Sequence, residues 1–284
     1  MASNNGELYV VATPIGNLAD ISQRALQVLN TVDVIAAEDT RHSRYLLQHY
    51  GIKTPLMALH QHNEARAANN ILSQLQQQKN IALISDAGTP LVSDPGAKLV
   101  QFLHQNGCKI IPIPGASAVI SALSVAGFSA DKFVFEGFLA SKTHAREKRL
   151  TELKDETRTL VFYEAPHRIV ACIQSLLSIF GQREIALVKE LTKCYETIYR
   201  APLEDVLTWL QQESARQKGE FVLVVAGNTA KDKHSLTPEA LRIFQILQQK
   251  MSLKDASKLA SEITNISRKV FYQQGLINQN KQKV

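Results

Sequence analysis

ISDAGTPLVSDPGA (residues 84–97) is an unusually elaborate turn for a chain of this kind. It continues the apolar run IALIS (81–85), and a helical pattern, AKLVQFLHQNG (97–107), begins at its last residue. Glycines let backbone groups approach a ligand without a Cβ in the way, and prolines stiffen a loop so that less conformational entropy is lost on binding. The two glycines and two prolines here therefore indicate a strand-to-helix loop that holds a ligand.

Short apolar runs alternate with helical patterns on both sides of this loop. We expect strands at 8–12, 32–38, 81–85 and 108–114, and helices at 20–32, 39–51, 65–80, 97–107 and 116–127. Such alternation is typical of a mainly parallel sheet that is covered by helices on both faces. The sequence thus predicts the α/β class, with a first domain over residues 1–130.

A second α/β domain is expected over residues 131–228. Its predicted strands are 133–139, 159–168, 183–191, 195–201 and 220–227, and its predicted helices are 166–181 and 203–217. Closely spaced strands favour a mixed sheet. The basic segment SKTHAREKRLTELKDE (141–156) is expected to form a flexible loop followed by a helix.

The C-terminal segment, 236–284, is expected to form a small helical domain. Three short helical patterns follow one another there, the middle one has a serine N-cap, and a short turn precedes ISRKVFYQ (266–273). This outline resembles helix–turn–helix modules that bind nucleic acid, although short helical pairs are also common elsewhere.

Composition narrows the function classes. The chain has 284 residues and a net charge of +6; residues 1–227 contain 22 basic and 22 acidic residues, whereas residues 228–284 contain ten and four. A basic segment on a neutral body favours a polyanionic partner, and a solvated lysine-rich tail is the alternative. No apolar run reaches the ~18 residues of a membrane helix, and the N-terminus lacks a signal-peptide pattern, so we expect a cytoplasmic protein. The three cysteines have no metal-ligand or disulfide spacing, which indicates reduced, packed thiols and no metal site.

Three predicted strand ends carry Gly/Pro turns: TPIGN (13–17), DAGTPLVSDPG (86–96) and PGASA (114–118). In an open α/β sheet, ligands bind outside the carboxyl ends of the strands, so these loops should line one cleft. Asp86, Asp94 and Ser117 would supply polar groups there; alternatively, these are ordinary turns in which Asp94 and Ser117 cap helices. The chain has neither GxGxxG after its first strand nor a Walker A motif, so a dinucleotide or NTP site is not expected.

Long motifs extend this interpretation by resemblance. The segments LYVVATPIGNLADISQRALQVLNTVDVIAAEDTRHS, ISDAGTPLVSDPG, IPIPGASAVISAL, FVFEGFL, TLVFYEAPHR and KELTKCYE, in this order, resemble the small-subunit ribosomal RNA methyltransferases of the tetrapyrrole-methylase-like (class III) family. The resemblance covers residues 7–227, and the terminal helices are similar to the helix–turn–helix appendage of these enzymes. It implies two α/β domains with S-adenosylmethionine in the cleft between them, a homodimer, and 2′-O-methylation of a cytidine in the decoding region of 16S rRNA, as naked RNA or within the small ribosomal subunit.

The family's cofactor contacts carry over to matching positions. They are Pro14, Ile15 and Gly16 in the first turn, Asp86, Ala87, Gly88, Thr89 and Val92 in the long loop, Ala116 and Ser117 in the third turn, and Tyr163, Glu190 and Phe221 in the second domain. Porphyrinoid relatives have an aspartate where this chain has Thr89, a difference that fits a substrate other than a porphyrin.

Methyl transfer to a ribose hydroxyl needs positioning, and a base or cation helps, typically by ~10²–10⁴-fold. Charged candidates lie at strand ends in EDTR, YEAPHR and VKELTK. We expect Arg41, Arg168 and Lys189 to contact phosphate or the hydroxyl, and Glu38 or Glu164 to orient them or accept the proton. The alternative is a network of ion pairs that braces the domain interface.

RNA contacts are expected from Arg146, Lys148 and Arg149 on the basic segment and from Arg268 and Lys269 on the last helix. Two other functions stay open at this point. One is methylation of a small substrate such as a porphyrinoid, which the basic tail and Thr89 disfavour. The other is a non-catalytic RNA- or DNA-binding protein, which would bind no cofactor.

Overall fold

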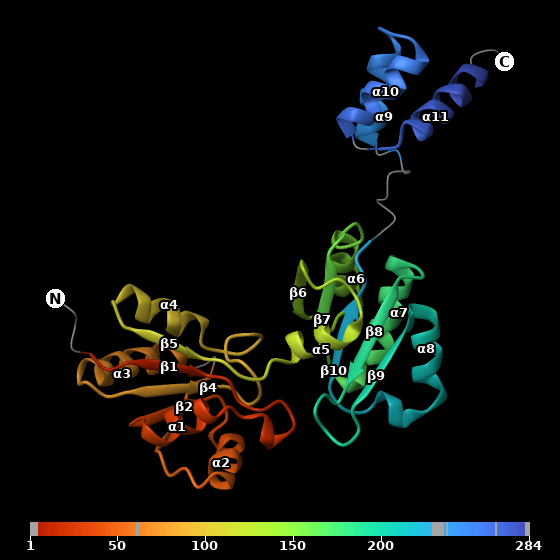
Figure 1. The fold of residues 1–284 in the computed structure, drawn as a ribbon. Coiled ribbons are helices and arrows are strands. Elements are labelled where there is room, and N and C mark those ends of the chain that lie inside the picture. The colour runs from red at the N-terminus through yellow and green to blue at the C-terminus, as the bar shows by residue number, and fades with distance from the viewer. Residues whose placement is uncertain (1–4, 61–62, 229–235, 237, 265, 282–284) are drawn as a thin grey trace. The chain divides into compact units, whose positions relative to one another are not determined.

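The computed structural model describes residues 5–60, 63–228, 236, 238–264 and 266–281. The chain divides into two compact units. One comprises residues 1–151 and 159–226, and the other comprises residues 152–158 and 227–284. The first unit contains both sheets of the protein, and the second contains the C-terminal helices (Figure 1).

The first sheet is wholly parallel. Its five strands are β1 (Leu8–Val11), β2 (Val34–Ala37), β3 (Leu56–Ala58), β4 (Ile81–Ile84) and β5 (Ile110–Ile113), in the order β3-β2-β4-β1-β5. The predicted strands are confirmed, and β3 is an addition that the sequence analysis missed. The central strands β1 and β4 bring the turns that follow them to the same edge of the sheet.

Helices cover both faces of this sheet (Figure 1). They are α1 (Gln23–Thr31), preceded by the short 3-10 helix η1 (Leu18–Asp20), α2 (Thr40–His49), α3 (Glu64–Gln76) and α4 (Ala97–Gln105). Alternate residues of β4 face opposite cores: Ile81 and Leu83 pack in the cluster that contains α3 and α4, and Ala82 and Ile84 pack in the cluster that contains α1 and α2. The continuous apolar run of β4 therefore reflects burial on both sides.

The second sheet is mixed, as predicted. It consists of β6 (Phe133–Phe138), β7 (Thr159–Glu164), β8 (Glu184–Lys189), β9 (Thr197–Pro202) and β10 (Phe221–Val225), in the order β6-β7-β10-β8-β9. Only the pair β6–β7 is parallel. The helices of this half are α5 (Ala118–Ala126), α6 (Thr143–Glu152), η2 (Pro166–Arg168), α7 (Ile169–Phe180), α8 (Leu203–Gln212) and η3 (Ser214–Gln217).

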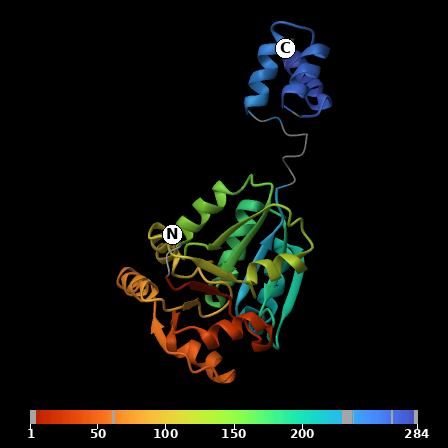
Figure 2. The same cartoon turned by 60° about the vertical axis from the view of Figure 1, so that its left-hand side comes forward.

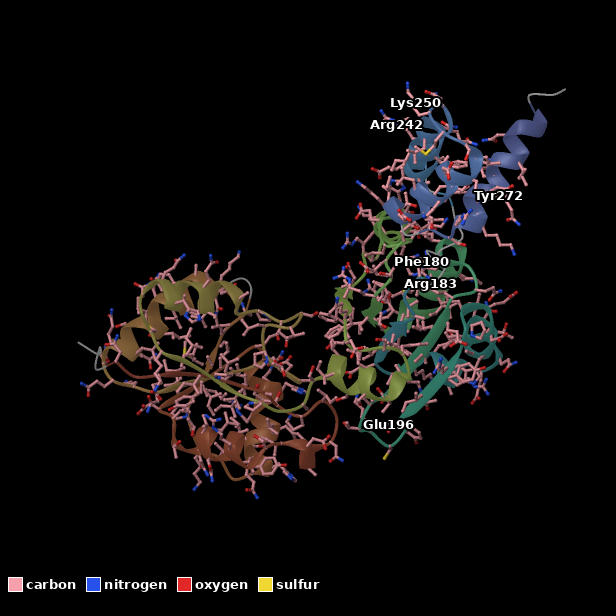
Figure 3. All side chains as sticks on the ribbon, turned by 45° about the horizontal axis from the view of Figure 1, so that its top comes forward. Phe180, Arg183, Glu196, Arg242, Lys250 and Tyr272 are labelled. Carbon is pink, nitrogen blue, oxygen red and sulfur yellow. The ribbon has the colours of Figure 1, made fainter. Side chains whose placement is uncertain are left out.

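Two elements of this half differ from the sequence-based expectation. Helix α5 precedes residue 130 but packs its buried face against β8 and β10, so by packing it belongs with the second sheet. Helix α6 occupies most of the segment expected to begin as a flexible loop, and Arg146 lies inside it. At the end of α7, the Arg183 guanidinium lies 4.2 Å from the ring centroid of Phe180. Figure 3 labels both side chains.

The C-terminal helices are α9 (Pro238–Gln248), α10 (Leu253–Thr264) and α11 (Arg268–Lys281), which pack on one another (Figure 2). Their core contains Phe244, Ala256, Ala260 and Phe271. The hydroxyl of Ser252 accepts the backbone N–H of Asp255 at 3.2 Å, which confirms the predicted serine N-cap of the middle helix.

Two further sequence-based expectations meet the structure here. Cys108 and Cys172 are buried free thiols, but Cys194 is exposed, so the expectation that all three are packed was wrong for Cys194. In the described ranges, no helix combines the length and apolarity needed to cross a membrane.

Candidate active site

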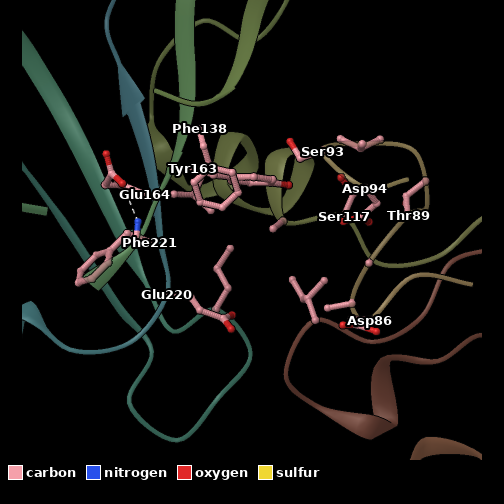
Figure 4. A pocket seen from close by; sticks show the side chains of 18 of the residues that line it. Asp86, Thr89, Ser93, Asp94, Ser117, Phe138, Tyr163, Glu164, Glu220 and Phe221 are labelled. Carbon is pink, nitrogen blue, oxygen red and sulfur yellow. Dashed lines mark hydrogen bonds between the residues drawn. The ribbon is translucent and has the colours of Figure 1, made fainter. Parts of the chain in front are cut away.

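A pocket of about 430 Å³ opens at the carboxyl edge of the first sheet, where the loops after β1 and β4 face the second sheet (Figure 4). The first half of the chain contributes Ile15, Glu38, Asp86, Ala87, Gly88, Thr89, Val92, Ser93, Asp94, Ser117 and Ala118. The second half contributes Phe138, Tyr163, Glu164, Ala165, Pro166, Val188, Leu191, Glu220, Phe221 and Val222. The cleft predicted from the Gly/Pro turns is therefore present.

Hydrogen bonds from backbone groups and from one side chain join the three predicted turns into one wall. Thr13 N donates to Gly88 O at 2.8 Å, and Gly88 N donates to Thr13 O at 3.1 Å. The hydroxyl of Thr89 donates to Ala116 O at 3.0 Å. Gly88 has φ +81°, and a Cβ there would lie 3.2 Å from Ile15 Cγ2. A side chain at position 88 would thus crowd the Ile15 side chain as well as strain the backbone.

The loop after β4 is strained next to the pocket. Leu91 and Ser93 adopt φ values of +76° and +72°, which non-glycine residues rarely take, and Gly96 has φ +120°. Ser93 Oγ lies 3.1 Å from where a Cβ of Gly137 would be, at the irregularity in β6. The loop therefore reaches the second sheet and presents Asp94 to the pocket. Strain of this kind is commonly concentrated at functional sites.

Asp94 does not cap the helix that follows it. The N-cap of α4 is Gly96, and the N–H groups of Lys98 and Leu99 donate to the buried Glu64 carboxylate at 3.1 Å each. Ser117 occupies the N-cap position of α5 but accepts no capping hydrogen bond. The interpretation of these two residues as ordinary caps is thus not supported, and both line the pocket.

Carboxylates concentrate on the first wall. Burial raises the pKa of Glu38, and the neighbouring charges of Asp94, Asp86 and Asp39 raise it further. Burial also raises the pKa of Asp94, with a smaller contribution from Asp86, while a hydrogen bond with Ser85 opposes the shift. Because these charges repel one another in a partly dry cavity, a cationic ligand would be stabilised there.

Aromatic side chains form much of the opposite wall. The Tyr163 ring on β7 lies 5.0 Å from Phe135 and 5.5 Å from Phe138, centroid to centroid. Burial, together with the charge of Asp94, raises the pKa of Tyr163 to about 12. In Figure 4 the Tyr163 hydroxyl points across the pocket toward the loop that carries Asp94. The pocket thus pairs a planar apolar surface with an acidic rim.

Glu164 anchors an arginine at the edge of the pocket. Its buried carboxylate accepts hydrogen bonds from Ala165 N at 2.7 Å and from Arg168 Nε. The Arg168 guanidinium lies 5.8 Å from the ring centroid of the exposed Phe138. A carboxylate held in this way is better placed to orient Arg168 than to accept a proton.

The structure brings together part of the predicted set. The pocket wall includes Ile15, Glu38, Asp86, Ala87, Gly88, Thr89, Val92, Ser117, Tyr163, Glu164 and Phe221; it does not include Pro14, Gly16, Arg41, Ala116, Arg168, Lys189 and Glu190. Gly16 instead lies against the loop Leu191–Lys193. Glu190 accepts hydrogen bonds from Lys193 Nζ at 3.0 Å and Glu220 N at 2.9 Å. Arg41 is 87% exposed and pairs with Asp39 at 3.0 Å.

The sequence analysis named Asp94 as a polar group of the cleft, and the structure confirms this position, but the analysis missed Ser93, Phe138 and Glu220, which also line the pocket. Asp94 had a signal, since it stands in one of the Gly/Pro turns. Phe138 and Glu220 had none, because only the folding of the second sheet against the first brings them to the ligand side.

The predicted RNA contacts differ in accessibility. Arg146 is only 4% exposed, and its guanidinium donates to Ser175 Oγ at 3.0 Å, so the structure argues against its contacting phosphate. Arg149 pairs with Glu136 at 2.8 Å, and Lys148 is exposed on α6. Arg268 and Lys269 are exposed in the first turn of α11. Figure 3 labels three other residues of the C-terminal helical segment, Arg242, Lys250 and Tyr272.

Comparison with known proteins places the chain among methylases. Residues 7–207 match the family described as Tetrapyrrole (Corrin/Porphyrin) Methylases, and residues 234–279 match the RsmI C-terminal HTH domain. The chain is 47% identical to Ribosomal RNA small subunit methyltransferase I of Escherichia coli O157:H7, over 98% of this chain and 97% of that protein. It is 49% identical to the protein of that name from Pseudomonas aeruginosa, over 97% and 99%. The fold also resembles uroporphyrin-III C-methyl transferase from Thermus thermophilus complexed with S-adenyl homocysteine, with a TM-score of 0.55 and 16% identity over 78% of this chain and 97% of that one.

Proposed function

The chain belongs to the tetrapyrrole methylase family, and within it to the Ribosomal RNA small subunit methyltransferase I group; from this we propose that it methylates the 2′-oxygen of a cytidine in the decoding region of 16S rRNA, using S-adenosylmethionine. The observation that carries the proposal is the near full-length similarity, which includes the helical C-terminal segment as well as the methylase body. The reaction takes place in the cytoplasm, where the small ribosomal subunit is assembled.

The residues of the pocket fit this cofactor. S-adenosylmethionine, when bound, supplies a methyl group on a positively charged sulfonium. The carboxylates of Glu38, Asp86 and Asp94 repel one another and would be relieved by that charge. The close approach of Gly88 to Ile15 leaves the turn free of a side chain on the ligand side. We assign the cofactor contacts to Ile15, Asp86, Ala87, Gly88, Thr89, Val92, Ser117, Tyr163 and Phe221. Four further residues do not line the pocket and help to position those that do: Pro14, Gly16, Ala116 and Glu190.

The charged residues divide into two roles. Glu38 is the better proton acceptor for the ribose hydroxyl, because its raised pKa makes it a stronger base and no other group is hydrogen-bonded to it in the described structure. Glu164 holds Arg168, so that Arg168 can meet the anionic backbone of the substrate. Lys189 at the end of β8 and Arg41 at the start of α2 act farther out, on phosphates.

Neither of the two rival functions is supported as well as the proposed one. A porphyrinoid substrate is suggested by the description of the matched family and by a solved structure that is 16% identical, and such a likeness shows the fold alone. A non-catalytic nucleic-acid-binding protein leaves the acidic pocket without a purpose. We also propose a homodimer, as the family implies; light scattering on the purified protein should give twice the 31.5 kDa chain mass.

The decisive experiment maps 2′-O-methyl groups on small-subunit RNA from cells that lack this protein. One cytidine modification in the decoding region should disappear and return on re-expression. Purified protein should restore it on undermethylated small subunits only when S-adenosylmethionine is added. Retention of every such methyl group in the deletion strain would refute the proposed function.

A further inference from the structure

Helix α2 presents a basic surface close to the candidate active site. Its sequence, TRHSRYLLQH, contains two arginines and two histidines and no acidic residue. Ser43, Leu46 and Leu47 are buried against the body, so the opposite face carries Arg41 and Arg44 outward. Residues 1–227 as a whole carry equal numbers of basic and acidic residues, and Asp39 pairs with Arg41, so the charge of this face that no carboxylate of the described residues pairs with is that of Arg44.

The same face contains an aromatic side chain. Tyr45 is 68% exposed, although it lies on a helix whose other large apolar residues are buried. Exposed aromatic rings beside cationic side chains are the combination on which single-stranded nucleic acids bind, because bases stack on the ring while phosphates meet the charges. Arg44 has no acidic partner among the residues that the structure describes, so its charge is available.

The position of α2 connects this face to the pocket. The helix starts at Thr40, two residues after Glu38, which lines the pocket, and the N–H of its N-cap Asp39 donates to Asp86 Oδ1 at 3.1 Å. Strand β2, which leads into α2, is hydrogen-bonded to β4, which leads into the pocket loop, and both strands are parallel. Tyr45 is six residues beyond Asp39, which is about 9 Å along a helix axis. An RNA strand that has one nucleotide in the pocket would therefore pass along α2.

We propose that the exposed face of α2, formed by Arg41, Arg44 and Tyr45, binds the RNA strand that flanks the target nucleotide. The arginines contact its phosphates, and the Tyr45 ring stacks on a neighbouring base. Asp39 orients Arg41 for this contact through hydrogen bonds from Arg41 Nε at 3.3 Å and Nη2 at 3.0 Å. This inference rests on the proposed function, since it presumes an RNA substrate.

The test compares two pairs of substitutions in the full-length protein, with small ribosomal subunits and naked 16S rRNA as probes. Arg44→Gln with Tyr45→Ala removes the α2 contacts. Lys53→Gln with Lys79→Gln removes exposed charges near the starts of β3 and β4, at the opposite edge of the same sheet. Binding is measured over a series of salt concentrations, and methylation over a series of substrate concentrations.

The α2 pair should raise the dissociation constant and KM for both RNA probes by on the order of tenfold or more, because one stacked base and one phosphate contact are lost. The slope of log affinity against log salt should fall by about one for Arg44→Gln, and Arg44→Lys should restore it. The rate at saturating substrate and the rise in melting temperature with S-adenosylmethionine should stay unchanged. The control pair should bind as the parent protein does.

The outcomes separate this inference from the function on which it rests. If the parent protein neither methylates nor binds either probe, the proposed function fails. If the parent is active and the α2 pair shows the same KM and salt slope, the inference is wrong. An equal loss in the control pair would reduce it to an effect of net charge. A loss confined to assembled subunits, with naked 16S rRNA bound normally, would assign the face to a ribosomal protein and overturn the RNA contact.

Discussion

The acidic groups of the pocket lower the stability of the ligand-free protein. Asp94 is partly buried next to other carboxylates, and it is presented by a loop with two non-glycine residues at positive φ. Its pKa in the folded state lies above its usual value, so the folded protein binds the proton more tightly than the unfolded chain does. The ionised carboxylate therefore lowers the free energy of unfolding once the pH exceeds that range.

Asp94→Asn should consequently stabilise the ligand-free protein at pH 7.5. The melting temperature should rise by on the order of 2 °C, and the gain should shrink at pH 4.5, where Asp94 is closer to neutral. The rise that S-adenosylmethionine adds should become smaller, because one partner of its charge is gone. Thermal unfolding with and without the cofactor measures both effects. Asp131→Asn on the exposed surface is the control; a loss of stability at pH 7.5 in Asp94→Asn would contradict the argument.

Glu38 gives a second prediction, about rate. If Glu38 accepts the ribose proton, single-turnover methylation should increase as the pH rises through its raised pKa, since only the ionised carboxylate can act. Asp94, Asp86 and Asp39 face Glu38 and set that range. Glu38→Gln should lower the rate by ~10²–10⁴-fold and remove this pH dependence, while the affinity for small subunits stays within a few-fold. A variant that keeps both the rate and the pH profile would exclude Glu38 as the base.

At the scale of elements, the joined turns after β1 and β4 depend on a glycine. Gly88→Val would combine backbone strain at φ +81° with a side chain 3.2 Å or less from Ile15. Gly51 offers a matched control, because it has φ +67° and nothing within 4 Å of an added Cβ. A non-glycine residue at such φ costs about 1–2 kcal/mol of stability, so Gly51→Val should lose roughly that amount and Gly88→Val should lose more, because its side chain also crowds Ile15. Only Gly88→Val should lose cofactor affinity, by tenfold or more in calorimetry; equal binding by both variants would move the cofactor elsewhere.

The sequence predicts elements well where local patterns suffice. The strand-to-helix loop at 86–96 could be recognised because the strand before it, β4, is apolar throughout and because α4 begins directly after the loop, at Ala97. Strand β3 could not, because LMA is only three residues long and pairs with β2 through tertiary context. The error on Arg146 has a similar cause: its charge is visible in the sequence, whereas its partner Ser175 lies on α7, 29 residues away.

The site follows the same rule. Residues within one loop, such as Asp86 to Val92, could be assigned together, because the strand end fixes their common location. Residues that meet them from the second sheet, Phe138 and Glu220 among them, depend on how the two sheets pack, and periodicity carries no information about that. The resemblance to a family supplied Tyr163 and Phe221 on this wall, and the residue patterns alone did not.

At the scale of the whole molecule, the chain separates chemistry from charge. The pocket lies within the first unit, whereas residues 228–284 hold the entire net positive charge. The helices α9, α10 and α11 have a core of their own around Phe244 and Phe271. Domain boundaries near residues 130 and 228 stay predictions, although the packing of α5 favours a first boundary before residue 118.

Removal of the C-terminal helices therefore tests the division of labour. The shortened chain should end after Asn228, whose backbone N–H donates to Glu156 O at 2.6 Å and whose side-chain amide donates to Lys154 O at 3.0 Å. Its cofactor-dependent rise in melting temperature should equal that of the full chain. A cofactor concentration of 100 times the dissociation constant raises the free energy of unfolding by about 2.7 kcal/mol. Its KM for small subunits should rise and its salt slope should fall, because the removed segment carries ten basic residues.

A paired substitution locates that effect on the last helix. Arg268→Gln with Lys269→Gln in the full chain should reproduce much of the change in salt slope, by about two if both contact phosphates. Lys254→Gln with Lys258→Gln on α10 removes the same charge and should have less effect, because these lysines stand on the other helix of the pair. Equal slopes in the full and shortened chains would mean that the helices do not bind RNA at all. Equal effects of the α11 pair (Arg268 and Lys269) and the α10 pair (Lys254 and Lys258) would instead show that the segment acts through its net charge and that α11 has no special role.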